Sequence, residues 1–549
     1  MREPRLTPAL RDATFRWIAD DVDPESRAEL QSVLAAAMGG DPAAVPDLGD
    51  RMAGPLRFGT AGLRGPVRAG PNGMNVAVVV RTTAGVAEWL RRHGHAGGTV
   101  VVGRDARHGS AAFAAAAAEV LTAAGFAVRT LPGPQPTPVL AFAVRHLGAV
   151  AGIQITASHN PPADNGYKLY DSTGAQIVPP ADTEIEAAIE AAPAAVSVPR
   201  APGVAELGDE LVAAYLATVA TLPRGTARAL RVVATALHGV GAEPLTRALT
   251  TAGFDPPRLV AEQADPDPDF PTVAFPNPEE PGATDLLLAL AEAEDADLAV
   301  ALDPDADRCA LGVRDRDGRW RMLGGDETGV LLGEHVLSTT GAPDPLVATT
   351  IVSSSLLADI AAAHGARYAE TLTGFKWLAR AGEGLVFAYE EAIGLCVNPE
   401  FVRDKDGIGA AVLAADLAAT LRERGRTLLD ALDDLAVRHG VHRTGQVALR
   451  VDRLDRIGEL MTALRSRPPA TLGGAGTEVD DLLPDADVLR MRGEGLRVVV
   501  RPSGTEPKLK AYLEVTEPVA DPAGLAAATA AAERRLADLT AEVRALLGA

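Results

Sequence analysis

Three segments of the chain share one pattern of apolar and polar positions. Each starts with a short β-branched run, passes through a small or polar turn, continues as an Ala- and Leu-rich stretch of helical length, and ends in a glycine and a second apolar run. The segments are residues 100–131, 230–260 and 346–372. Because parallel strands need a helical crossover, this pattern predicts three βαβ units.

The two ends of the chain follow other patterns. Residues 1–50 predict an amphipathic helix and then an irregular Pro-, Gly- and Asp-rich stretch at 39–50, which together form a helical preface. Residues 191–208 have the Pro, Ala and Val content of a linker. Towards the C-terminus the pattern predicts a strand, a helix, two strands joined by a Pro/Gly turn, and a last helix, at residues 444–451, 457–465, 496–500, 510–515 and up to 547.

We therefore expect an α/β protein with four domains, of which three are related α/β domains and the C-terminal one is α+β. The predicted domains are residues 1–205, 206–322, 323–440 and 441–549. The length of 549 residues agrees with this number, since it corresponds to between three and four domains of about 150 residues.

The composition narrows the class of protein. With 47% apolar and 23% charged residues, the chain is close to an average soluble protein, which excludes wholesale disorder, collagen-like repeats and long coiled coil. The formal net charge of −21 argues against a dedicated binder of nucleic acid or of anionic membranes. Two cysteines are too few for a disulfide framework, and we see neither a signal-peptide core nor a membrane span. We therefore expect a cytoplasmic protein.

The first loop with candidate chemistry is TASHNPPADNGYKLY at residues 156–170, directly after a predicted strand. In α/β sheets, the loops at the carboxyl ends of strands hold the ligands. Ser158 supplies a hydroxyl, His159 can contact an anion, and Lys168 supplies an ammonium group. The functional interpretation of this loop is a serine that can be phosphorylated. A surface turn rich in Asn, Pro and Gly is the alternative for SHNPP alone.

The second loop is DPDADR at residues 303–308, directly after the apolar run 296–302. Three carboxylates at alternate positions are hard oxygen ligands that can converge on one divalent cation, and Arg308 can bind a phosphate in the same place. This spacing favours Mg²⁺. An exposed acidic turn or a Ca²⁺ loop is the competing interpretation, although the spacing of an EF-hand is absent.

The third and fourth loops suit a phosphorylated sugar. YEEAIG at residues 389–394 has two adjacent glutamates that can accept hydrogen bonds from vicinal hydroxyls, and Lys405 in RDKDG can meet a phosphate. A solvated acidic loop is the alternative there. RPSGTEPKLK at residues 501–510 combines cations, hydroxyls and exposed N–H groups, which predicts a phosphate cradle. A plain β-turn would explain residues 502–504 but not the surrounding cluster.

Together with FGTAGLRG at residues 58–65, these four loops resemble, in the same order, the signature loops of the α-D-phosphohexomutase superfamily. The helical preface, the acidic Pro-rich stretch 264–282 and the EEAIG form are most similar to the branch that includes phosphoglucomutase-2 and phosphopentomutase. The resemblance implies four domains, three of them with mixed sheets, around one central cleft to which each domain contributes one loop.

The resemblance also implies roles for residues of the first two loops and of 58–65. Ser158 would carry the phosphoryl group, steadied by His159 and Arg308. Arg64 and Lys168 would lie near the reacting hydroxyl, with Lys168 as general acid/base. Mg²⁺ would be held by a phosphoserine oxygen from Ser158 and by Asp303, Asp305 and Asp307.

The remaining loops would bind the substrate. Glu390 would accept hydrogen bonds from the sugar hydroxyls, and Thr373 and Gly374 would line the same subsite. Lys405 would assist the phosphate cradle. The cradle would hold the non-reacting phosphate with Arg501, Ser503, Gly504 and Thr505.

The implied reaction moves phosphate between C1 and C6 of an aldohexose through a bisphosphosugar, with glucose 1-phosphate to glucose 6-phosphate as the first expectation. Because Ala392 stands where many relatives carry a serine, a phosphomannomutase or a phosphopentomutase stays open. The implied cofactors are Mg²⁺ and a sugar 1,6-bisphosphate, or a pentose 1,5-bisphosphate, as activator. The expected partner is a small phosphosugar, with no nucleic acid and no membrane, and the expected assembly is a monomer or weak homodimer.

Two rival functions also stay open. A metal-dependent phosphatase would share Ser158 and the acidic loop, but it would have no need for a separate phosphate cradle. A non-catalytic sugar-phosphate sensor would need neither the serine nor the three aspartates.

Overall fold

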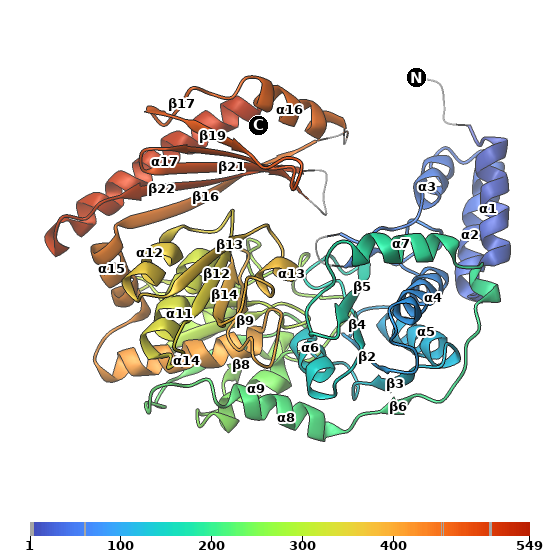
Figure 1. Ribbon diagram of the computed structural model, residues 1–549, viewed down its shortest axis with the longest axis horizontal. Coiled ribbons are helices and arrows are strands. Elements are labelled where there is room, and N and C mark those ends of the chain that lie inside the picture. Colours follow the sequence, from blue (N-terminus) through green and yellow to red (C-terminus); the bar gives the residue numbers. More distant parts are fainter. Residues whose placement is uncertain (1–4, 60–61, 452, 454, 504–507, 549) are drawn as a thin grey trace. The chain divides into compact units, whose positions relative to one another are not determined.

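The computed structural model describes residues 5–548 except 60–61, 452, 454 and 504–507 (Figure 1). The described residues form two compact units. The first contains the chain up to Pro223, Arg228–Gly312 and Cys396–Ala415. The second contains Arg224–Ala227, Val313–Leu395 and the chain from Asp416 onward.

The first unit opens with a helical preface. Thr7 and Asp23 accept hydrogen bonds from the first turns of α1 and α2, and each helix has a proline in its first turn. The irregular stretch predicted at 39–50 is wrong for its second half, because α3 forms there and buries Leu48 completely. The three helices are α1 (Pro8–Asp20), α2 (Pro24–Met38) and α3 (Ala44–Arg51).

The first sheet is mixed, with the strand order β1-β5-β4-β2-β3-β6. Parallel pairing of β2 with β3, across helix α5, confirms the βαβ unit predicted at 100–131. β4 is parallel to β2, whereas β5 is antiparallel to both β4 and β1. The linker predicted at 191–208 contains a short strand, since β6 pairs with β3. The elements are β1 (Leu63–Pro66), α4 (Val76–Arg92), β2 (Thr99–Arg104), α5 (Ser110–Ala123), β3 (Ala127–Thr130), α6 (Thr137–His146), β4 (Ala151–Ile155), β5 (Asp164–Asp171), α7 (Ala181–Ala191), η1 (Ala195–Ser197) and β6 (Ala205–Glu206).

The second sheet of this unit contains β10, β9, β7 and β8 in that order. β7 and β8 are parallel across helix α9, which confirms the unit predicted at 230–260. β9 is completely buried and antiparallel to β10, so the connection between them, residues 303–308, emerges at one end of the sheet. The elements are α8 (Asp209–Val219), β7 (Val232–Thr235), α9 (Ala242–Thr251), β8 (Arg258–Leu259), η2 (Ala261–Gln263), α10 (Asp285–Ala293), β9 (Leu298–Leu302) and β10 (Cys309–Arg314).

The second unit contains the third βαβ unit, since β12 and β13 are parallel across α12, as the pattern at 346–372 predicts. The order of this sheet is β13-β12-β14-β15. From residue 320 to 439 the chain forms β11 (Trp320–Met322), α11 (Gly325–Thr339), β12 (Leu346–Thr350), α12 (Leu356–Ala363), β13 (Arg367–Thr371), α13 (Phe375–Leu378), β14 (Leu385–Glu390), β15 (Gly394–Cys396), α14 (Gly407–Glu423) and α15 (Leu428–His439). The last residue of β15 and the part of α14 up to Ala415 belong to the first unit.

The C-terminal sheet is antiparallel, with the order β16-β22-β21-β20-β19, and helices α16 and α17 pack against it around one apolar core. This arrangement confirms the predicted α+β domain. Its elements are β16 (Val441–Arg450), α16 (Asp455–Ser466), β17 (Thr471–Leu472), β18 (Ala475–Gly476), β19 (Glu478–Asp481), β20 (Leu489–Gly493), β21 (Leu496–Pro502), β22 (Lys508–Glu517), η3 (Pro522–Gly524) and α17 (Leu525–Leu547).

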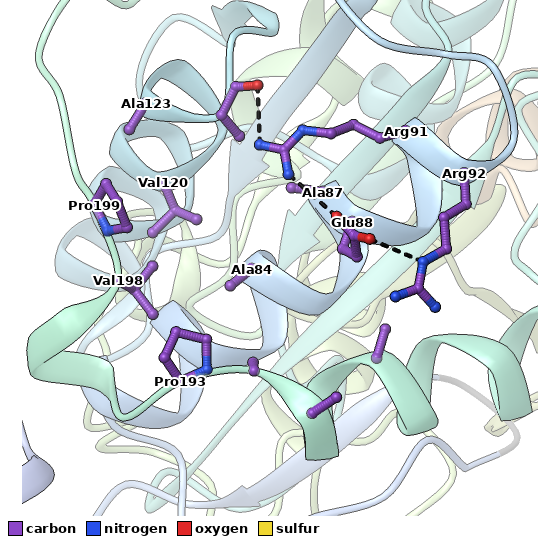
Figure 2. A pocket seen from close by; sticks show the side chains of 14 residues that line it. Ala84, Ala87, Glu88, Arg91, Arg92, Val120, Ala123, Pro193, Val198 and Pro199 are labelled. Atoms are coloured by element: carbon purple, nitrogen blue, oxygen red, sulfur yellow. Dashed lines mark hydrogen bonds and ion pairs between the residues drawn. The ribbon is translucent and has the colours of Figure 1, made fainter.

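A cavity of about 350 Å³ lies between α4, α5, α7 and residues 192–199 of the first unit. Figure 2 shows its alanine, valine and proline lining, with Glu88 between Arg91 and Arg92 at one side. None of the predicted site residues lines it. In the described part of the chain, no helix is long and apolar enough to cross a bilayer.

Candidate active site

Ser158 lies in the loop after β4, at the carboxyl end of the parallel part of the first sheet. Its φ of 54° is in the left-handed region, and its side chain is completely buried. Ser158 Oγ donates a hydrogen bond to Asp303 Oδ2 at 2.7 Å, and Arg308 Nη1 donates one to Ser158 Oγ at 2.9 Å. The structure therefore brings the predicted phosphoserine loop and the predicted metal loop together in the first unit.

The three aspartates of the metal loop form a tight buried group. Asp303, Asp305 and Asp307 each offer one oxygen, and these atoms lie within 4.8 Å of one another. Lys168 Nζ donates to Asp305 and to Asp307 at 2.7 Å each. Within the described residues, Asp305 Oδ1 and Asp307 Oδ1 are buried and accept no hydrogen bond. Burial of a carboxylate oxygen without a partner costs free energy, and a bound cation would offset this cost. The three aspartates could therefore hold a divalent metal ion.

The surroundings of the three aspartates raise the pKa of one carboxyl group and lower the pKa values of the other two. Burial, together with the neighbouring Asp305 and Asp307, raises the pKa of Asp303. Burial also acts against ionisation of Asp307, but Lys168 and Lys405 hold its pKa below the usual range. Burial and Asp307 oppose ionisation of Asp305 in the same way, and Lys168 nevertheless keeps its pKa lowered. The carboxylate with the raised pKa is the one that faces Ser158.

Arg308 also determines which ring nitrogen of His159 carries the proton. Arg308 Nη1 lies 2.5 Å from His159 Nδ1, and because a guanidinium only donates, Nδ1 is the acceptor. Burial, followed by the charges of Arg308 and Arg64, lowers the pKa of His159 well below 6.5. The neutral ring therefore carries its proton on Nε2, from which it can donate to an anion.

Arg64 reaches the same loop from β1. Its Nη1 donates to Asn160 Oδ1 at 3.1 Å, and its buried Nε has no hydrogen-bond partner among the described residues. Burial and the charge of Arg308 lower its pKa, but an arginine stays charged after such a shift. A buried guanidinium N–H without a partner suits an oxygen of a bound anion.

Lys405 belongs to the first unit. Lys405 Nζ lies 3.3 Å from Asp307 Oδ2 and 3.5 Å from Asp404 Oδ1. The Tyr170 hydroxyl donates to Asp404 Oδ2 at 2.7 Å, and Gln176 Nε2 donates to the same oxygen at 2.9 Å. The RDKDG segment is thus held on the first sheet, and it places Lys405 beside the aspartates.

The second unit contains the other predicted substrate contacts. Glu390, the last residue of β14, is nine-tenths buried. Thr373 is half-buried, and Gly374 has a φ of 112°, a backbone conformation that L side chains rarely adopt.

The phosphate cradle begins at the end of β21. Arg501 lies in β21, and the Ser503 N–H donates to Lys508 O at 2.8 Å. Burial and the charge of Glu391 raise the pKa of Tyr512, while Arg501 opposes this shift through its charge and a hydrogen bond. Tyr512 therefore interacts with Arg501 of the cradle and with Glu391 of residues 389–394, which we call the sugar loop. Two further predicted cradle residues, Gly504 and Thr505, lie outside the described residues.

Sequence reasoning missed the side chains that hold these loops in place. Thr137 Oγ1 donates to Asp305 Oδ2 at 2.5 Å, and no pattern around Thr137 signals this contact. Tyr170 could have been found, because it lies two positions after Lys168 in the same strand and so shares its face of the sheet. Gln176 carries no such signal.

Models of protein families match four successive segments of the chain. The models of phosphoglucomutase/phosphomannomutase α/β/α domains I, II and III match residues 55–195, 213–318 and 324–438, and the model of the C-terminal domain matches residues 449–532. A solved phosphoglucomutase/phosphomannomutase family protein of Burkholderia thailandensis aligns with a TM-score of 0.69 at 22% identity over 89% of this chain and 97% of that one, which shows the same fold.

Curated relatives cover most of the chain. A probable phosphomannomutase of Haemophilus influenzae is 43% identical over 452 residues, which is 80% of this chain and 93% of that protein. The phosphopentomutase of Mus musculus is 33% identical over 570 residues, 93% of this chain and 90% of that protein. A phosphoglucomutase of Staphylococcus epidermidis is 33% identical over 500 residues, 84% and 91% of the two chains. The chain therefore belongs to the phosphoglucomutase/phosphomannomutase family of phosphosugar mutases, within the α-D-phosphohexomutase superfamily.

Proposed function

We propose that this enzyme moves a phosphoryl group between C1 and C6 of an aldohexose phosphate, with Ser158 as the group that carries it. The observation that supports this most is the buried Ser158 hydroxyl between Asp303 and Arg308, beside two carboxylate oxygens that have no partner in the described residues. A sensor of sugar phosphates would have no need for this arrangement.

The proposed transfer is a balanced exchange. A sugar hydroxyl oxygen forms a bond to phosphorus while the bond from phosphorus to Ser158 Oγ breaks. The hydroxyl loses a proton and Ser158 Oγ gains one, and the return transfer to the serine reverses both changes. Lys168, completely buried on β5, is the proposed proton carrier.

Two further side chains steady the phosphoryl group in this proposal. Arg308 already donates to Ser158 Oγ, and the Nε2–H of the neutral His159 can donate to a phosphoryl oxygen. Donors fixed before the reaction stabilise developing charge without having to reorganise. Because Ser158 is completely buried, water is also kept from the phosphoserine.

The three aspartates are the proposed Mg²⁺ ligands, together with an oxygen of the phosphoserine. Hard oxygen donors with low pKa values, such as those of Asp305 and Asp307, match this cation. When bound, the ion neutralises negative charge on the phosphoryl oxygens. The proposed activator is a sugar 1,6-bisphosphate, or a pentose 1,5-bisphosphate, which phosphorylates Ser158.

In the second unit, the proposed contacts of the non-reacting phosphate are Arg501, Ser503, Gly504 and Thr505. The proposed contacts of the sugar are Glu390, Thr373 and Gly374. Lys405, which we expected to assist the cradle, is instead proposed to act beside Asp307, since it lies 3.3 Å from that carboxylate.

We further propose that the protein is a monomer or weak homodimer in the cytoplasm, with no nucleic-acid or membrane partner. The proposed domains are residues 1–205, 206–322, 323–440 and 441–549.

Glucose 1-phosphate is the proposed substrate, and mannose and pentose 1-phosphates are the alternatives. Two observations favour keeping them. Relatives that are 43%, 33% and 33% identical are named phosphomannomutase, phosphopentomutase and phosphoglucomutase, respectively. The sugar loop also has Ala392, without a hydroxyl, beside its two glutamates.

The test is ³¹P NMR of the purified protein with Mg²⁺, a trace of sugar bisphosphate, and equimolar glucose, mannose and ribose 1-phosphates in one tube. We expect a terminal-carbon phosphate resonance to grow, fastest for the preferred sugar. Growth of inorganic phosphate alone would establish a phosphatase in place of the mutase. No change in any resonance would favour the sensor.

A further inference from the structure

Arg107 lies after β2, and its guanidinium donates hydrogen bonds to backbone carbonyl groups of the Ser158 loop. Its Nη2 donates to the carbonyl oxygens of Ser158 and Asn160 at 2.6 Å each. Its Nη1 donates to those of Pro161 and Asp164 at 2.8 and 3.1 Å. One side chain, 1% exposed, therefore satisfies carbonyl groups over seven residues of the loop.

The surroundings of Arg107 compensate for its burial. Its Nε lies 3.5 Å from Asp105 Oδ2, and its guanidinium lies 4.9 Å from the centre of the Phe270 ring. Asp105 Oδ1 also accepts the Arg107 backbone N–H at 3.0 Å, which fixes the turn that aims the side chain at the loop. A planar guanidinium with five N–H groups can make this set of bonds, and a lysine with three donors cannot.

The loop needs such support because Ser158 has a left-handed backbone. Its φ of 54° is unfavourable for a residue with a Cβ atom, so surrounding contacts must hold it. The Ser158 N–H donates to Thr156 Oγ1 at 2.9 Å, and the Ser158 carbonyl is held by Arg107. The two peptide groups of the serine are thus fixed on both sides of its side chain.

We propose that Arg107, oriented by Asp105, is a positioning residue that sets the reactive geometry of Ser158 without contacting the sugar. This inference rests on the proposed phosphoryl transfer. The charge of Arg107 also reaches the site, since it is one of the charges that lower the pKa of His159. Misplacement of a reacting atom by about 1 Å can cost about 100-fold in rate, so a loosened loop should slow the transfer step.

The test compares Arg107→Met, Arg107→Lys, Arg107→Ala and the control Arg81→Met. Arg81 also donates to two backbone carbonyls, of Ile189 and Ala192, but lies outside the site. We expect Arg107→Met to lower kcat by about 100-fold with KM changed by less than about 3-fold, Arg107→Lys to lose less, and Arg81→Met to stay within about 2-fold. Added guanidinium ion should restore part of the activity of Arg107→Ala.

A second readout does not depend on turnover. Amide hydrogen exchange of residues 156–166 should be faster in Arg107→Met than in the wild type and unchanged in Arg81→Met. Wild-type kcat in a folded Arg107→Met enzyme would overturn the inference and leave the mutase function intact. If the wild type has no mutase activity, the proposed function fails, and unaltered exchange in the variant would then overturn the positioning role by itself. If Arg107→Met does not fold, the same measurements on Arg107→Lys decide.

Discussion

Glu514 offers a sharp test of the second unit, because one buried carboxylate holds several of its segments. On strand β22, Glu514 Oε1 accepts hydrogen bonds from Ser354 Oγ at 2.7 Å and from Ser355 N at 2.8 Å. His442 Nδ1 lies 3.1 Å from the same oxygen, and Arg497 Nη2 lies 2.9 Å from Oε2. The perturbation is Glu514→Gln, which keeps the shape of the side chain and removes its charge.

The magnitude follows from the pKa of this carboxyl group. Burial opposes ionisation, but the hydrogen bond from His442 and the charge of Arg497 lower the pKa of Glu514 from 4.5 to about 2. Such a difference between the unfolded and folded states is worth about 3 kcal/mol of stability. Because the folded-state pKa is the lower one, this contribution is complete above pH 4.5 and is lost as the pH falls towards 2.

The assay is thermal and urea unfolding of the wild type and Glu514→Gln between pH 7 and pH 3.5. At pH 7 we expect the transition of this unit to fall by about 6–12 °C, since about 1 kcal/mol shifts a unit of this size by about 2–4 °C. Below pH 4.5 the difference should shrink by about 1.4 kcal/mol per pH unit. The control Glu533→Gln removes an exposed carboxylate of α17 that lies 4.0 Å from Arg443, and should change little. A difference that stays constant from pH 7 to pH 3.5 would refute the reasoning.

Three other predictions concern the first unit. Ser158→Ala should abolish covalent phosphorylation after incubation with sugar bisphosphate, as intact-protein mass spectrometry shows, and should lower mutase turnover by at least about 1,000-fold. Tyr170→Phe should destabilise the protein by about 1–3 kcal/mol, because Asp404 loses a buried donor, and should lower kcat through the displaced Lys405; a wild-type rate in the folded variant would argue against that route. Titration calorimetry should show that Mg²⁺ binds the phosphorylated enzyme more tightly than the unphosphorylated one, and equal affinities would contradict a charge balance between metal and phosphate at the three aspartates.

The sequence predicted most of the fold because its signals were local. The three βαβ units and the C-terminal hairpin follow from periodic patterns that each lie within about 35 residues. The prediction for residues 39–50 was wrong in its second half. The Gly and Pro content indicates an interruption of helical structure, whereas packing of the fully buried Leu48 stabilises a helix there. β6 was missed because two residues at a sheet edge carry no period.

The site shows the same division between local and distant information. Ser158 and the three aspartates could be found because each motif directly follows an apolar strand. The position of Lys405 beside Asp307 could not be predicted from the sequence. Lys405 lies only 15 residues after Glu390, which suggests that both belong to the same substrate site. Its neighbours Asp404 and Asp406 are fixed instead by Tyr170 and Tyr215, which lie 234 and 191 residues away. Contacts at such separations leave no pattern in either segment.

The charges around the three aspartates explain why metal and phosphate should bind as a pair. Three carboxylates carry a formal charge of −3, and the cations in ionic contact with them within the described residues, Lys168, Lys405 and Arg308, carry +3. A divalent ion alone would leave this buried site at +2, and a phosphoryl dianion alone would leave it near −2. Both together restore neutrality, which is the least costly state for buried charge. Each should therefore raise the affinity for the other by the same factor. The formal net charge of −21 belongs to the whole chain, and screening over about 8 Å in physiological salt leaves the charges next to the aspartates to decide whether an anion binds.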